Sequence, residues 1–71
     1  MRIAYDPEVD ALYIRFKEGP VTTEHVAEGI AFDYDAERKL AGIEILDATQ
    51  RLGDPAALTQ IVLENVALRP T

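Results

Sequence analysis

Strict alternation of apolar and polar side chains is the feature that most constrains how this chain can fold. Residues 11–17 alternate throughout: one side carries Leu12, Ile14 and Phe16, and the other carries Tyr13, Arg15 and Lys17. A period of two places successive side chains on opposite faces of an extended strand. Residues 29–35 and 39–46 repeat the pattern, with apolar sides made of Ile30, Phe32 and Tyr34 and of Ala41, Ile43 and Ile45. The chain is therefore predicted to build a sheet with one apolar face.

Turn residues separate these segments. A short extended stretch at residues 3–5 ends at Asp6-Pro7-Glu8, where an Asx side chain and a proline favour a turn. Residues 35–38 are a polar break of hairpin-loop length. Residues 21–28 are rich in β-branched side chains but irregular, which is typical of either a short edge strand or an extended loop. Residues 1–46 are thus predicted to form an antiparallel β-meander of about four strands.

The pattern changes after Leu46. Asp47 can cap a helix, Gln50 follows at the spacing of a capping box, and Gly53 can end the helix. Asp54-Pro55 repeats the start signal. We therefore predict one or two short helices within residues 47–71, the second reaching about residue 60 and followed by extended chain. The expected fold is a single α+β domain over residues 1–71.

A chain of 71 residues lies near the lower limit for a single hydrophobic core without disulfides, metal or a partner chain. Burying each large side chain of the apolar face is worth roughly 1.5 to 3 kcal/mol, so this face requires a cover. The C-terminal third offers only modest cover, from Leu52, Leu58, Ile61, Leu63 and Val66. These considerations predict a homodimer.

Composition excludes several classes of protein. The absence of cysteine excludes disulfides, thiolate metal sites and cysteine nucleophiles, and it suits a cytoplasmic protein. The first ten residues carry acids where a signal peptide needs an apolar stretch, and no segment is apolar enough to span a membrane. A net charge of −6 repels nucleic acid and anionic membranes, whereas a basic protein partner is easier to accommodate.

Clustered carboxylates are the first candidates for a site. Three alternate in the first turn: Asp6, Glu8 and Asp10. Proline makes this stretch a turn, and the glycine and further ligands of a calcium loop are missing, so we interpret it as structural. Asp33 and Asp35 flank the second hairpin and would join the first group only if both turns lie at one end of the sheet.

The remaining candidates are weaker. Glu44 is expected on the outer face, paired with Arg15 or a lysine. His25 is the only histidine and lacks a partner at metal-ligand spacing, which indicates a surface or edge-strand residue. No base stands at a known spacing from the four threonines considered, Thr22, Thr23, Thr49 and Thr59. We expect the three tyrosines to lie at the edges of the core and in cross-strand pairs: Tyr5, Tyr13 and Tyr34. We predict no catalytic residue, no cofactor-binding residue and no metal site.

The segments YDPEVDALYIRF and DYDAERKLAGIEILDATQRL resemble a prokaryotic family of domains of unknown function, the one numbered 2283. The resemblance spans about residues 3–52, and the pairing of YDxExDxLYI with GIEILDA is fairly specific, whereas residues 53–71 carry no matching motif. It implies a small sheet with a C-terminal helical element and no established activity. Some members are suspected, from gene context, to be antitoxins of toxin-antitoxin pairs. Asp6, Asp10 and Glu44 match the pattern without gaining a role.

Together these observations predict a protein of unknown biochemical function that is a small, non-enzymatic protein-interaction module. It is expected to form a homodimer and to bind a basic protein, in an antitoxin-like role, but neither nucleic acid nor membrane. The alternative is a small-ligand or divalent-metal-binding protein that uses the turn carboxylates Asp6, Asp10, Asp33 and Asp35.

Overall fold

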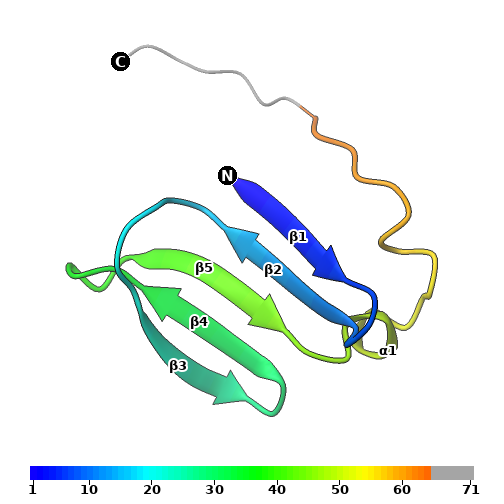
Figure 1. The fold of residues 1–71 in the computed structure, drawn as a ribbon, viewed down its shortest axis with the longest axis horizontal. Helices are drawn as coiled ribbons and strands as arrows, with labels where there is room; N and C mark the ends of the chain where they lie inside the picture. The colour runs from blue at the N-terminus through cyan, green and yellow to red at the C-terminus, as the bar shows by residue number, and fades with distance from the viewer. Residues whose placement is uncertain (65–71) are drawn as a thin grey trace.

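The computed structural model describes residues 1–64, and residues 65–71 lie outside the described part. Within it the chain forms one antiparallel sheet and one short helix (Figure 1). The strands are β1 (Arg2–Asp6), β2 (Ala11–Arg15), β3 (Thr22–Ala27), β4 (Ile30–Tyr34) and β5 (Leu40–Ile45), and the helix is α1 (Ala48–Leu52). The segment left open in the sequence, residues 21–28, is thus an edge strand, β3.

The strand order differs from the predicted meander. The sheet has five strands in the order β1-β2-β5-β4-β3, and every neighbouring pair is antiparallel. The connection after β2 passes the ends of β5 and β4 and delivers β3 to the far edge (Figure 1). All six residues of β3 are exposed, while the apolar strands β2 and β5 lie inside the sheet. Meander order would bury a polar strand between two apolar ones, and this arrangement avoids it.

The predicted α+β class is wrong, because residues 1–64 are mainly β structure with a single helix of five residues. The second helix is replaced by turns: the amide of Ala57 donates to the carbonyl of Asp54, and that of Thr59 to the carbonyl of Ala56. These bonds span three residues instead of the four of an α-helix. Asp54 does accept from the amide of Ala56 (2.9 Å), so the start signal produces an Asx turn without a helix behind it.

The start of α1 also differs from the prediction. Asp47 has a left-handed backbone (φ 53°) and makes no side-chain cap. Asp10 replaces it from the first turn, accepting from the amide of Thr49 (3.1 Å) and from its hydroxyl (2.8 Å). Gly53 ends the helix in the left-handed conformation, as predicted.

The two faces of the sheet differ sharply. The row Ile3, Ile14, Ile43 and Phe32 follows directly from the pairing register, which confirms that the alternating segments share one apolar side. We call this side the apolar face; it carries Ile3, Tyr5, Leu12, Ile14, Phe16, Ile30, Phe32, Tyr34, Ala41, Ile43 and Ile45, with Thr22 and Glu24 of β3 at its edge. The opposite side is the polar face; it carries Arg2, Ala4, Tyr13, Arg15, Thr23, His25, Ala31, Asp33, Gly42 and Glu44.

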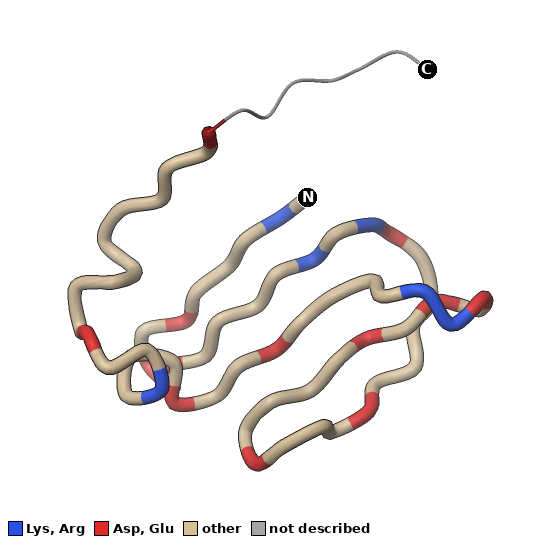
Figure 2. Tube along the Cα trace, turned by 180° about the vertical axis from the view of Figure 1, so that it is seen from behind, with Lys and Arg blue, Asp and Glu red and all other residues tan. Residues whose placement is uncertain are grey.

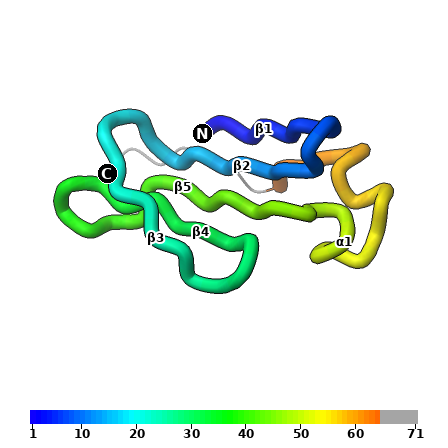
Figure 3. The backbone as a smooth tube through the Cα atoms, turned by 60° about the horizontal axis from the view of Figure 1, so that its bottom comes forward, coloured from blue at the N-terminus to red at the C-terminus, as the bar shows by residue number. Residues whose placement is uncertain are grey.

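The sheet is a single layer, as Figure 3 shows. Only four apolar side chains are buried within residues 1–64: Leu12, Ala31, Ala41 and Ala48. The chain exposes 5699 Å², whereas a compact monomer of 7.9 kDa exposes about 4,400 Å². Of the C-terminal side chains expected to cover the sheet, Leu58 is half-buried, and three are exposed: Leu52 by 47%, Ile61 by 56% and Leu63 by 70%. Val66 lies outside the described residues.

Candidate functional site

The polar face holds one deeply buried carboxylate, that of Asp33 in β4, which is only 2% exposed. The hydroxyl of Tyr13 in β2 donates to its Oδ2 (2.8 Å), and the hydroxyl of Thr23 in β3 donates to its Oδ1 (2.6 Å). Both oxygens are therefore engaged by neighbours from the two sides of β4. No buried side-chain polar atom within residues 1–64 lacks a hydrogen-bond partner.

Gly42 in β5 makes this network geometrically feasible. β5 lies between β2 and β4, so the ring of Tyr13 has to cross it to reach Asp33. A Cβ at position 42 would lie 3.0 Å from the carbonyl oxygen of Ile14, 3.2 Å from Asp33 Oδ2 and 3.3 Å from Tyr13 Oη. A glycine inside a strand often marks a close approach of this kind. The position of Gly42 is thus explained by the crossing side chain.

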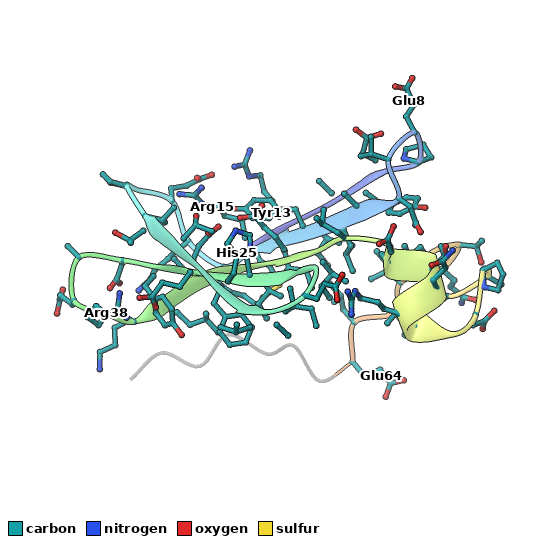
Figure 4. The ribbon with its side chains drawn as sticks, turned by 90° about the horizontal axis from the view of Figure 1, so that it is seen from below. Glu8, Tyr13, Arg15, His25, Arg38 and Glu64 are labelled. Atoms are coloured by element: carbon teal, nitrogen blue, oxygen red, sulfur yellow. The ribbon has the colours of Figure 1, made fainter. Side chains whose placement is uncertain are left out.

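Arg15 supports the network from the end of β2. Its guanidinium donates to the hydroxyl of Tyr13 (3.3 Å) and to the carbonyls of Lys17 (2.9 Å) and Gly19. It also pairs with Glu18 (3.6 Å). Within residues 1–64 Glu44 forms an ion pair with neither Arg15 nor a lysine, so the pairing predicted for Glu44 is wrong. In Figure 4, Tyr13, Arg15 and His25 lie together on the same side of the sheet. Arg15 therefore ties the loop after β2 to the network around Asp33.

Glu44 lies diagonally opposite Asp33 on the polar face: Asp33 pairs with Gly42, and Glu44 is two residues further along β5. Burial raises the pKa of the Glu44 carboxyl, the charge of Asp33 and a hydrogen bond to it raise this pKa further, and His25 opposes the shift. Burial also acts to raise the pKa of Asp33, but hydrogen bonds from Thr23, Tyr13 and Glu44 outweigh it and hold this pKa below its usual value. The pair therefore prefers a proton on Glu44 and a charge on Asp33.

Two carboxyl groups with separated pKa values can serve as general acid and base. Here Asp33 is nearly inaccessible and both of its oxygens are already occupied. A depression of about 220 Å³ does occur in the chain, but it is lined by residues 17–20 and 35–37 and by none of the polar-face residues. Sites for small ligands usually measure about 300 to 1,000 Å³. The network is therefore organised to hold strands β2, β3 and β4 in place.

The turn carboxylates form two separate groups. Asp6 accepts from the amide of Glu8 (2.9 Å), which confirms the structural turn, and Asp10 binds Thr49 and the hydroxyl of Tyr5 (2.7 Å). The hydrogen bond from Tyr5 lowers the pKa of Asp10 and, in turn, raises the pKa of Tyr5 itself. Both acids therefore have structural partners.

Asp35 lies at the other end of the sheet, because β4 starts beside the end of β5 near the first turn and runs away from it. It accepts from the amides of Glu37 (2.9 Å) and Lys39 (2.8 Å) and pairs with Lys17, which lowers its pKa. The structure does not bring Asp35 together with Asp6 or Asp10. Within residues 1–64 no three side chains of the kinds that bind metals lie close enough to hold an ion.

Comparison with known proteins defines the family. A family model described as "Protein of unknown function (DUF2283)" matches residues 2–48, which include all five strands and the start of α1. The chain therefore belongs to the DUF2283 family. No curated protein and no solved structure matches it. Within residues 1–64 of this DUF2283 protein, no helix is both long and apolar enough to cross a membrane.

The family match covers the whole network around Asp33 in the DUF2283 protein and, of the network around Asp10, everything except Thr49. Sequence reasoning named both acids but missed their partners, Tyr13, Thr23 and Thr49. Two signals pointed to the first network: an aspartate within an alternating strand and a glycine in the interior of another. His25 lies exposed on edge strand β3, as expected. Tyr34 packs against Phe32 and under Arg38, whose guanidinium lies 4.5 Å from the ring centre.

Proposed function

We propose that this DUF2283 protein is a non-enzymatic protein-interaction module that works as a homodimer. One observation carries the proposal: within residues 1–64 only Leu12 and Ala41 are buried on the apolar face, although this face bears most of the large apolar side chains of the sheet. Ile14, Phe32 and Ile43, at its centre, are all partly exposed. Faces of this kind in soluble proteins mark interaction sites.

The size of the face suits self-association. Five strands about 4.8 Å apart, with five residues of about 3.3 Å each, give a face of roughly 24 by 17 Å. Covering it removes roughly 400 Å² from each copy, about 800 Å² in total, which is the size of a weak, reversible interface. The apolar area gained stabilises by about 25 cal/mol per Å². A second copy therefore provides the core that one copy lacks.

The polar face supports a role without catalysis. The buried carboxylate of Asp33 is enclosed by hydroxyl donors, and the polar-face residues do not line the depression between residues 17–20 and 35–37. Its network gives rigidity to the sheet that presents the apolar face. We therefore assign the polar-face residues a structural role.

A basic protein is the further partner that we propose, in keeping with the net charge of −6 and the antitoxin-like role that the family resemblance suggests. We place this activity in the cytoplasm, since the chain has no cysteine. Co-purification from the native cell at native expression levels, followed by mass spectrometry, tests the partner. Recovery of the homo-oligomer alone would contradict it.

Sedimentation velocity of the full chain at micromolar concentration tests the homodimer. We expect a dimer that dissociates on dilution and a melting temperature that rises with protein concentration, because association stabilises the folded chain. A folded monomer whose melting temperature does not depend on concentration would contradict the proposal.

A further inference from the structure

We propose that two copies pack apolar face against apolar face with their strands running in opposite directions, so that the acidic end of each sheet lies over the basic end of the other. This inference rests on the proposed homodimer and specifies its surface and orientation. It follows from the open face, from the uneven charge along the strands and from the position of β5 at the centre of the sheet.

The two ends of the sheet carry different charge (Figure 2). At the acidic end, next to α1, lie the turns β1–β2 and β3–β4 and the exit of β5. Its charged residues are Asp6, Glu8, Asp10, Glu28, Asp47, Asp54 and Arg51, a net charge of −5. At the basic end lie the loop after β2 and the hairpin β4–β5. Its charged residues include five of the chain's seven lysines and arginines, Arg2, Arg15, Lys17, Arg38 and Lys39, which give this end its name. Five acids balance them: Glu18, Asp35, Glu37, Asp33, which is level with Arg15 in the register, and Glu24, which pairs with Arg38, so the net charge is 0.

Pairing through the face is favoured over pairing through an edge. Adding β1 or β3 of a second copy to an edge would extend the sheet but leave the apolar face in water. Strand β3 is also irregular, with a register shift between His25 and Ala27, and it carries Glu24. Irregularity and charge of this kind protect sheet edges from pairing. Only contact between the faces buries Ile14, Phe32 and Ile43 in both copies.

Two symmetric arrangements bring equal faces together, because homodimers of this kind have a two-fold axis. An axis parallel to the strands places each end of the sheet over the same end of the partner. An axis across the strands places each end over the opposite one. In both cases the central strand β5 crosses its counterpart at Ile43, which lies midway along the apolar side of β5. The choice therefore depends on the ends.

Charge decides between the arrangements. If equal ends met, the two acidic ends, each with a net charge of −5, would face each other across sheets packed about 10 Å apart. This separation is close to the Debye length at physiological salt. The opposed arrangement would instead place each end with a net charge of −5 over an end with a net charge of 0, so the two acidic ends would not meet. Charge complementarity fixes the register of interfaces, and juxtaposed like charges are costly. The apolar contact is similar in both arrangements, so the opposed one is more stable.

Single cysteines test the orientation cleanly, because the chain has none of its own. Ile45→Cys places a thiol on the apolar face at the acidic end of β5, and Tyr34→Cys places one at the basic end of the neighbouring strand β4. Ile43→Cys is the matched control at the centre. The full-length variants are refolded singly or as a mixture, treated with a short reagent that links two thiols, and analysed by mass spectrometry.

We expect strong cross-linking between two copies of Ile43→Cys. In the mixture we also expect Ile45→Cys to link to Tyr34→Cys, several-fold more than either variant links to itself. Strong linking within Ile45→Cys alone would overturn the opposed orientation. If the wild-type chain sediments as a dimer but Ile43→Cys does not cross-link, the apolar face is not the interface. A wild-type monomer, with the face covered by its own C-terminal segment, would instead refute the proposed homodimer.

Discussion

The polar and apolar faces of this sheet are built from alternate residues of the same strands, yet they solve the problem of burial in different ways. On the polar face, Asp33 reaches 2% exposure without a second layer, because the side chains of Tyr13, Thr23 and Glu44 close over it. On the apolar face, Leu12 is buried, but the other large side chains stay at least partly exposed. Directional hydrogen bonds can thus enclose a group within one layer, whereas apolar burial needs a second surface.

The largest expected effect tests the apolar face. Phe32→Ala should reduce the free energy of unfolding by about 3–5 kcal/mol, the cost of removing a phenylalanine from a packed core. The measurement is urea unfolding at fixed chain concentration. The control is His25→Ala, at an exposed position of the polar face on the adjacent strand, with an expected change within about 0.5 kcal/mol. A similar small change for Phe32→Ala would mean that this face stays in water.

Removal of the buried acid tests the polar face. Asp33→Ala leaves the hydroxyls of Tyr13 and Thr23 without their acceptor, and it should cost about 2–3 kcal/mol in unfolding free energy. Asp33→Asn keeps the shape and one acceptor oxygen and should cost less. Equal losses for the two variants would show that packing, rather than hydrogen bonding, holds this face together.

A smaller effect is expected at the crossing point of Tyr13. Gly42→Ala introduces a Cβ only 3.0 Å from the carbonyl oxygen of Ile14 and close to the Tyr13 hydroxyl, and it should cost about 1–2 kcal/mol. In a Tyr13→Phe background part of the crowding disappears, so the loss caused by Gly42→Ala should shrink. A double-mutant cycle by urea unfolding measures the coupling. A coupling energy of zero would show that the cost of Gly42→Ala does not depend on the Tyr13 hydroxyl.

The smallest effect is a change in pH dependence at Glu44. The pKa of Glu44 is raised above 4.5, so its contribution to stability is complete below that value and is lost as pH rises through the raised pKa. Asp33 has the opposite sign: its pKa is lowered from 3.8, and its contribution is lost only as pH falls through the lowered value.

Glu44→Gln should therefore raise stability at neutral pH by about 0.2–1 kcal/mol, the size of one cross-strand pair, and leave the acid side of the profile unchanged. Unfolding free energies measured by urea from acidic to neutral pH test this. A variant that follows the wild-type profile at neutral pH would show that Asp33 and Glu44 do not repel each other.

Local chain patterns determined the strands, their faces and most of the turns. Alternation within residues 11–17, 29–35 and 39–46 depends only on neighbours in the sequence, and the observed register keeps each apolar side intact. The turn at Asp6 and the end of α1 at Gly53 are local in the same sense. These features could be predicted because backbone geometry imposes them wherever the segment lies.

Tertiary structure alone decided the strand order, the cap of α1 and the burial of Asp33. Asp10 binds Thr49, 39 residues away, and Tyr13 binds Asp33, 20 residues away. Once β2 pairs with β5 rather than β3, Tyr13 faces Asp33 across Gly42, and Asp35 moves to the end opposite Asp6. Such contacts depend on which distant segments pair, and pairing is chosen by the burial of whole strands, which no local pattern encodes.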